Sequence, residues 1–166
     1  MYIIRFIATL LSILALFSVA RAEDWQTETV ERIDLAVPLK KAYTTNEQGQ
    51  RFQLTRGPAG PVYAVFELDK DTVDELGAGD PLYKVDENPT RSLADYGQFL
   101  KMGSKTAKWP VWNGNGNPCK PSSPKSILRG SALCEIMEGE KITFKYFTTK
   151  GESRKTHFSL DGAKEA

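Results

Sequence analysis

The residue best suited to proton transfer is His157, the one histidine of this 166-residue chain. The unperturbed pKa of histidine lies near neutrality, and Ser159 and Asp161 follow it closely, so a small acid–base centre is one interpretation. In a strand of period two, however, the apolar residues Phe158 and Leu160 take the inward face. His157 and Ser159 then point to solvent, and we expect an exposed strand histidine.

Carboxylates gather between Asp69 and Glu75, and hard oxygen ligands at alternating positions would suit Ca²⁺. The EF-hand pattern needs Asp or Asn at its fifth position and Gly at its sixth, where this run has Val73 and Asp74. We therefore expect a solvated, charged loop. A zinc site built on two histidines is excluded within one chain, and the sequence predicts no metal site and no cofactor.

A pair of carboxylates would support glycoside hydrolysis. Asp80, Asp86 and Glu87 follow the acidic run and are candidates to form such a pair with it. The sequence does not fix the distance between the carboxylates, so a cell-wall or glycan hydrolase stays open as an alternative function. The G-x-S-x-G, P-loop and G-x-G-x-x-G motifs are absent from the chain.

Two tryptophans, Trp109 and Trp112, precede a glycine- and asparagine-rich stretch that contains Asn113 and Asn115. Aromatic rings on such a loop suit stacking on sugars or docking of a partner, because they offer contact area at low entropy cost. The competing interpretation is that both rings fill the edge of a small core. These four residues are the candidate binding site.

Residues 1–22 have the pattern of a cleaved secretory signal, with Arg5, an apolar stretch from Phe6 to Val19, and an A-x-A site at 20–22. The apolar stretch would be about 21 Å long as a helix, too short for a hydrocarbon core of about 30 Å. An uncleaved membrane anchor is the alternative. We expect a mature chain of residues 23–166, without a transmembrane segment, in the periplasm or secreted.

The mature chain is close to neutral, because the whole chain has 22 basic and 21 acidic residues and Arg5 and Arg21 leave with the signal. This balance gives no indication of a nucleic-acid partner. All of the 13 glycines and 9 prolines lie in the mature part and favour many turns. No repeat or linker divides the chain, so a single domain is predicted over residues 23–166.

Two cysteines, Cys119 and Cys134, lie in the mature chain, and an exported domain matures in an oxidising compartment. An even count with this spacing favours one structural disulfide, which contributes about 3 kcal/mol in the chain-entropy model. A redox pair or a nucleophilic thiol is the alternative, but redox pairs are usually adjacent and only His157 could act as the base.

Short alternating segments dominate the chain and predict β-strands. Strands are expected at 33–37, 51–55, 62–68, 81–85, 142–147 and 156–160, the last two as a hairpin around Lys150-Gly151. Residues 62–68 are apolar on both faces at first, which is typical of a central strand. Residues 92–102 read as a turn of helix and then a strand, whereas 109–124 is expected to be irregular.

One helix is predicted over residues 131–138, with Ser131 as its N-cap, an apolar stripe, and Gly139 at its end. Cys134 lies on this helix, so a bridge to Cys119 would hold the irregular segment expected at 109–124 against the helix. The expected fold class is all-β: a small β-sandwich or jelly-roll-like domain with one short helix and one disulfide.

The last third of the chain resembles a known family. The residues that carry the resemblance are Leu133-Cys134-Glu135, Gly139, Ile142–Tyr146, Gly151 and Phe158–Ala163. They resemble the end of the invasion-associated locus B family, in which a cysteine-bearing helix precedes a strand and a final strand ends in a glycine motif. The chain departs from the family in having no cysteine shortly after Trp25. The resemblance implies an exported β-sandwich of a Gram-negative bacterium, associated with the envelope and host interaction. It assigns no catalytic residues to this chain.

These patterns predict an exported protein that works by binding and not by catalysis. Its partner would be a protein or glycan of the bacterial cell envelope or of a host, contacted by loops such as 109–112. Two alternatives stay open: the hydrolase with an Asp/Glu pair, and a proteinaceous inhibitor of such hydrolases, which would present one protruding loop.

Overall fold

The computed structural model describes residues 24–31, 38–56, 60–96, 100–114, 116–120 and 132–166. The expected signal peptide, the strand at 33–37, the candidate Asn115 and the helix cap Ser131 lie outside the described residues.

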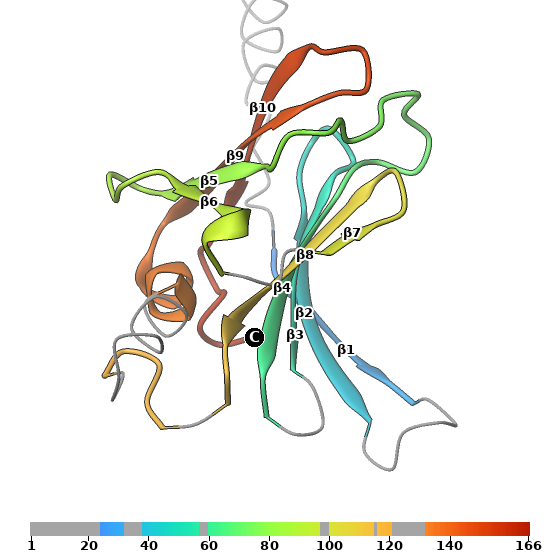
Figure 1. Ribbon diagram of the computed structural model, residues 1–166. Coiled ribbons are helices and arrows are strands. Elements are labelled where there is room, and N and C mark those ends of the chain that lie inside the picture. The colour runs from blue at the N-terminus through green and yellow to red at the C-terminus, as the bar shows by residue number, and fades with distance from the viewer. Residues whose placement is uncertain (1–23, 32–37, 57–59, 97–99, 115, 121–131) are drawn as a thin grey trace, which may run out of the picture.

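Two antiparallel sheets make up the fold (Figure 1). In chain order the elements are β1 (Gln26–Val30), β2 (Leu39–Thr45), β3 (Arg51–Arg56), β4 (Val62–Glu67), β5 (Leu82–Val85), β6 (Arg91–Ser92), the 3₁₀ helix η1 (Leu93–Tyr96), β7 (Leu100–Met102), β8 (Thr106–Trp112), a helix at 132–138, β9 (Lys141–Phe147) and β10 (Ser153–Ser159). The first sheet has the order β1-β2-β3-β4-β8-β7 and the second β10-β9-β5-β6. The predicted all-β domain with one short helix and one disulfide is confirmed.

The core lies between the two sheets and is rich in aromatic rings. Phe66 of β4 stacks on Phe144 of β9, with ring centroids 4.7 Å apart and planes at 8°. Phe52 of β3 packs 5.9 Å from Phe158 of β10. Each of these strands alternates buried with less buried residues, so one face of each sheet supplies the core.

Most of the expected strands are present in the described residues. β3, β4, β5, β9 and β10 fall where the alternation predicted them, and β4 is central, between β3 and β8. Residues 92–102 contain the short helix η1 and then β7, as expected. The mostly polar residues 26–30 also form a strand: β1 pairs with β2 at the sheet edge, where polar side chains need no burial.

The expectation that residues 109–124 are irregular is wrong for the first four of them. β8 continues through Pro110 to Trp112. Proline is tolerated because β7 pairs only with residues 106–108, so the missing N–H removes no bond to β7. On the other side Pro110 is opposite Tyr63, next to a register shift after Val62.

The helix at 132–138 packs on the core through Ala132 and Ile136, which are fully buried. It ends at Gly139, whose N–H still donates to the carbonyl of Glu135 at 2.9 Å. A Cβ at position 139 would lie only 2.4 Å from Cγ1 of Val85 on β5. The glycine therefore lets the helix end approach the second sheet closely.

Candidate functional site

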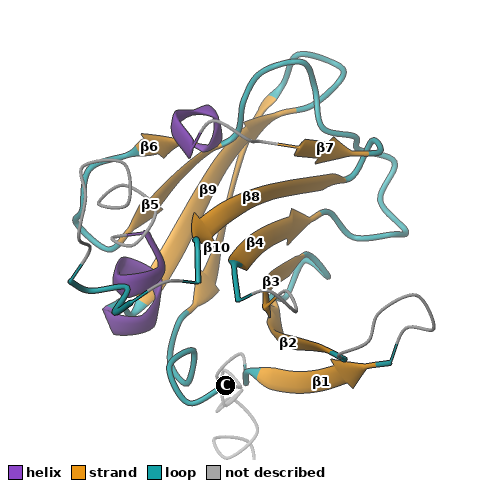
Figure 2. Cartoon of the chain, turned by 60° about the horizontal axis from the view of Figure 1, so that its bottom comes forward, coloured by secondary structure: helices purple, strands orange, loops and turns teal. Residues whose placement is uncertain are grey.

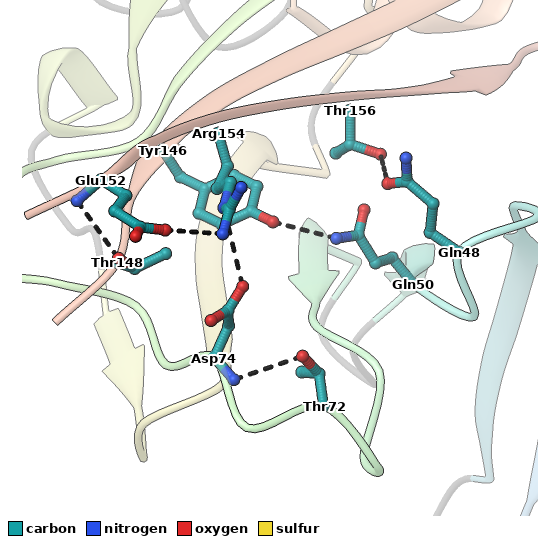
Figure 3. A network of polar contacts seen from close by, with 9 residues as sticks. All are labelled: Gln48, Gln50, Thr72, Asp74, Tyr146, Thr148, Glu152, Arg154 and Thr156. Atoms are coloured by element: carbon teal, nitrogen blue, oxygen red, sulfur yellow. Dashed lines mark hydrogen bonds and ion pairs between the residues drawn. The ribbon is translucent and has the colours of Figure 1, made fainter. Parts of the chain in front are cut away.

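One end of the sandwich is closed by buried polar side chains (Figure 3). Gln50, the residue before β3, donates through Nε2 to the Tyr146 hydroxyl at 3.0 Å. Asn46 donates to Thr156 at 2.7 Å, and the Thr156 hydroxyl donates to Gln48 at 3.2 Å. Burial raises the pKa of the Tyr146 phenol. Three of these side chains are almost completely buried, so the network closes this end of the sandwich to solvent.

An ion-pair chain on the surface of the same end joins the acidic loop to the β9–β10 hairpin (Figure 3). Arg154 lies 2.6 Å from the carboxylate of Glu152 and 3.7 Å from that of Asp74. The backbone N–H of Asp74 donates to the Thr72 hydroxyl at 3.2 Å. The Arg154 side chain is half exposed, so these pairs add little stability and mainly position the loop.

The acidic loop itself is held by a lysine. The Lys105 ammonium donates to the carbonyl oxygens of Asp69, Lys70 and Thr72 at 3.4, 2.7 and 2.6 Å. One Asp69 carboxylate oxygen accepts from the N–H of Asp71 at 3.2 Å. The backbone carbonyl oxygens of this loop thus face a cation of the protein itself.

The carboxylates weighed for hydrolysis also make structural contacts. Asp86 accepts hydrogen bonds from the backbone N–H groups of Glu140 and Lys141 at 3.0 and 2.9 Å, which fixes the turn after β5. Glu87 pairs with Lys84 at 2.8 Å, and this hydrogen bond lowers the pKa of Glu87. Both acids therefore have a local structural role.

His157 is exposed on β10, as predicted from the alternation. Its neighbour Phe158 is fully buried, which places the two side chains on opposite faces. The Ser159 hydroxyl accepts from the N–H of Asp161 at 3.2 Å, a local turn contact. The geometry of this segment is that of an ordinary strand end.

The opposite end of the six-stranded sheet carries a groove of about 680 Å³. At this end of the β2–β3 pair, Lys40 is opposite Arg56, whereas Thr45 is opposite Arg51 at the closed end. Five strands of the first sheet, β1, β2, β3, β4 and β8, line one side of the groove, and the helix at 132–138 and the last residues of the chain line the other. Figure 2 shows where these elements lie. The apolar floor includes Ala42, Leu54, Val62, Trp112, Leu133 and Met137.

A single row of side chains crosses the sheet at the groove. Lys40 is opposite Arg56, and Arg56 is opposite Val62 in turn. Val62 is opposite Trp112. Arg56 lies two residues after the buried Leu54 and therefore shares its inward face. Two cations thus stand on the inner face of the sheet beside apolar side chains.

The two tryptophans of the predicted binding site have different environments. Trp109 is completely buried and packs against Phe52 and Tyr83, with centroids at 6.4 and 5.9 Å. The hypothesis that Trp109 contacts a partner is therefore wrong, because its place on the inner face of β8 puts the ring in the core. Trp112 is half-buried and lines the groove, with the exposed Asn113 next to it.

The predicted disulfide between Cys119 and Cys134 is confirmed, with Cα atoms 5.1 Å apart. The bridge connects Cys119, the neighbour of Pro118, to the helix that carries Leu133. Pro118 and Leu133 both line the groove. The bridge therefore holds two parts of the groove wall together. The carboxylate of Glu138 is near the bridge, but the two sulfurs are bonded to each other and are not thiolate ligands.

Sequence reasoning missed most of the groove. Of the residues that it missed, Arg56 could have been identified from the sequence. It follows Phe52 and Leu54 at the same spacing of two, so it occupies an inward-facing position of the strand, where an apolar residue is expected instead of a charged one. The approach of Leu133 and Met137 to this sheet had no sequence signal.

None of the helices in the described part of the chain is long and apolar enough to cross a membrane. Comparison of the chain with protein-family models, curated proteins and solved structures gives no match. The candidate site is therefore defined by the geometry of the groove.

Proposed function

We propose that this chain is an exported binding protein of the bacterial cell envelope that acts without catalysis, and that its partner occupies the groove beside Trp112. The observation that carries the proposal is the half-buried Trp112 ring on the wall of this groove. A large aromatic side chain that packs against the core on one side and remains accessible on the other is typical of a binding anchor.

Three further features support this function. The leader of residues 1–22 directs the chain out of the cytoplasm, and the disulfide suits an oxidising compartment. The resemblance of residues 133–166 to the invasion-associated locus B family favours the cell envelope, with host interaction as one role. A protein or glycan with an apolar group that enters the groove would fit this surface.

The proposal is tested by affinity capture with mature protein, residues 23–166, and envelope extract. We expect Trp112→Ala to abolish capture of the partner that the wild type retains. Its Tm should stay close to that of the wild type, because the ring lies at the edge of the core. Trp109→Ala should instead lower the free energy of unfolding by about 3–5 kcal/mol, the usual cost of truncating a buried aromatic residue.

Tyr63→Ala is the matched control. Tyr63 is also a half-buried aromatic residue of the first sheet, but it lies on the outer face, where Lys108 covers its ring at 4.4 Å. Capture should survive this substitution. Unchanged capture by the Trp112 variant, or equal loss in the Tyr63 variant, would show that the partner does not depend on the groove.

A further inference from the structure

We infer that the groove binds an amphiphile with a single acyl chain and an anionic head group. This inference concerns the groove of the proposed function and goes beyond it, because it adds a small amphiphilic ligand to the protein or glycan partner proposed there. The apolar floor would take the chain, and Lys40 and Arg56 would take the head group.

The charge of the groove supports an anion. Like charges directly opposite each other on antiparallel strands destabilise a sheet, and Lys40 lies directly opposite Arg56. Across the residues that the structure describes, neither side chain forms an ion pair that would offset this repulsion. The charged side chains that line the groove are Lys40, Lys41, Arg56, Lys164, Glu28 and Glu165, four cations against two anions. The carboxylate of the last residue, Ala166, also lies there, which leaves a small cationic excess. An anionic ligand would relieve the repulsion between the two facing cations.

The shape and chemistry of the floor support an acyl chain. The groove volume of about 680 Å³ lies within the range of small-ligand sites, which is roughly 300–1,000 Å³. Leu54, Val62 and Trp112 come from the sheet, and Leu133 and Met137 from the helix. Methionine adapts readily to flexible apolar ligands. Lys40 and Arg56 lie on the β2–β3 side of the groove, and Leu133 and Met137 lie on the opposite side. The acyl chain would therefore extend across the groove from its head group to the helix.

Two sources share this head-group chemistry: a fatty acid carries a carboxylate, and a lysophospholipid carries a phosphate. Both are strong acceptors for arginine and lysine. Decanoate and decyl phosphate represent the two sources with the same chain length, while decanol and decyltrimethylammonium supply a neutral and a cationic head group.

The experiment measures the binding of these four amphiphiles to mature protein, below their critical micelle concentrations, by calorimetry and tryptophan fluorescence. We expect decanoate or decyl phosphate to bind at least tenfold more tightly than decanol, since hydrogen bonds to charged groups contribute a factor of that order. Decyltrimethylammonium should bind most weakly. Octanoate should bind more weakly than decanoate, by roughly fourfold for each methylene removed.

The variant K40Q/R56Q should bind decanoate about as weakly as decanol and leave decanol binding unchanged. The matched control is K70Q/K155Q, which removes the same charge from exposed lysines outside the groove. The control should keep the preference for the anion. Decyl phosphate binding more tightly than decanoate would support the inference with a lysophospholipid, and the reverse order would support it with a fatty acid.

Equal binding of decanol and decanoate by the wild-type protein, or no binding of any amphiphile, overturns the inference whether or not K40Q/R56Q folds. The proposed function then still stands if Trp112→Ala abolishes partner capture. Loss of partner capture in K70Q/K155Q but not in K40Q/R56Q would also count against the inference, because it would place the relevant charges outside the groove.

Discussion

Removal of the disulfide should lower the free energy of unfolding by about 3 kcal/mol. The two cysteines are separated by 15 residues, and closure of a loop of this length in the unfolded chain accounts for about that amount in the chain-entropy model. The double variant C119S/C134S removes the bridge without leaving a free thiol. The loss is large beside a total stability of about 5–15 kcal/mol, and it should lower Tm by roughly 10 °C.

Urea denaturation, followed by tryptophan fluorescence, to which the buried Trp109 contributes, measures this difference. The m value should rise slightly, because the unbridged unfolded chain exposes more surface. Wild-type protein treated with a reductant is the matched control and should unfold at the same urea concentration as the variant. A loss below about 1 kcal/mol would refute the argument from loop closure. A loss well above about 5 kcal/mol would show that the bridge also maintains native contacts between its loop and the helix.

Two further substitutions test the closed end and the helix end. Burial raises the Tyr146 pKa above its usual 10.0, so the stability it contributes is present below pH 10 and is lost as pH rises through the folded-state pKa. Urea titrations between pH 8 and 11 should show this decline in the wild type and a shallower one in Tyr146→Phe; parallel declines would contradict the assignment. Gly139→Ala should destabilise the protein by roughly 1–3 kcal/mol, because its Cβ would overlap Val85, although alanine is normally the better helix former. Thermal unfolding measures this cost, and an unchanged or higher Tm would show that the helix end shifts freely.

Local patterns predicted much of the fold. The alternation of Phe52 with Leu54 and of Phe144 with Tyr146 identified strands because a strand has a fixed period of two, whatever it packs against. The hairpin between β9 and β10 followed in the same way, with Gly151 at a positive φ of 79° in its turn. Residues 109–112 were misread because their proline and tryptophans resemble a loop, and only the absence of a β7 partner at Pro110 makes a strand acceptable there.

The candidate site was only partly predictable. Trp112 was identified as a surface aromatic residue, but Trp109 was placed beside it on the same grounds, although its ring lies in the core. The two residues have the same type and nearly the same sequence context. Their different burial arises from the register shift between β4 and β8, next to Val62, and from the packing of the Trp109 ring against Phe52 between the sheets.

The sequence by itself determined most of the strands, the helix near the second cysteine and the pairing of the only two cysteines, because these depend on local periodicity and on simple counting. The tertiary structure alone decided which aromatic rings are buried and which end of the sandwich is closed. It also brought Arg56, Trp112 and Met137 around one groove. Such proximity depends on how two sheets and a helix pack, and residues far apart in the chain carry no local sign that they will meet.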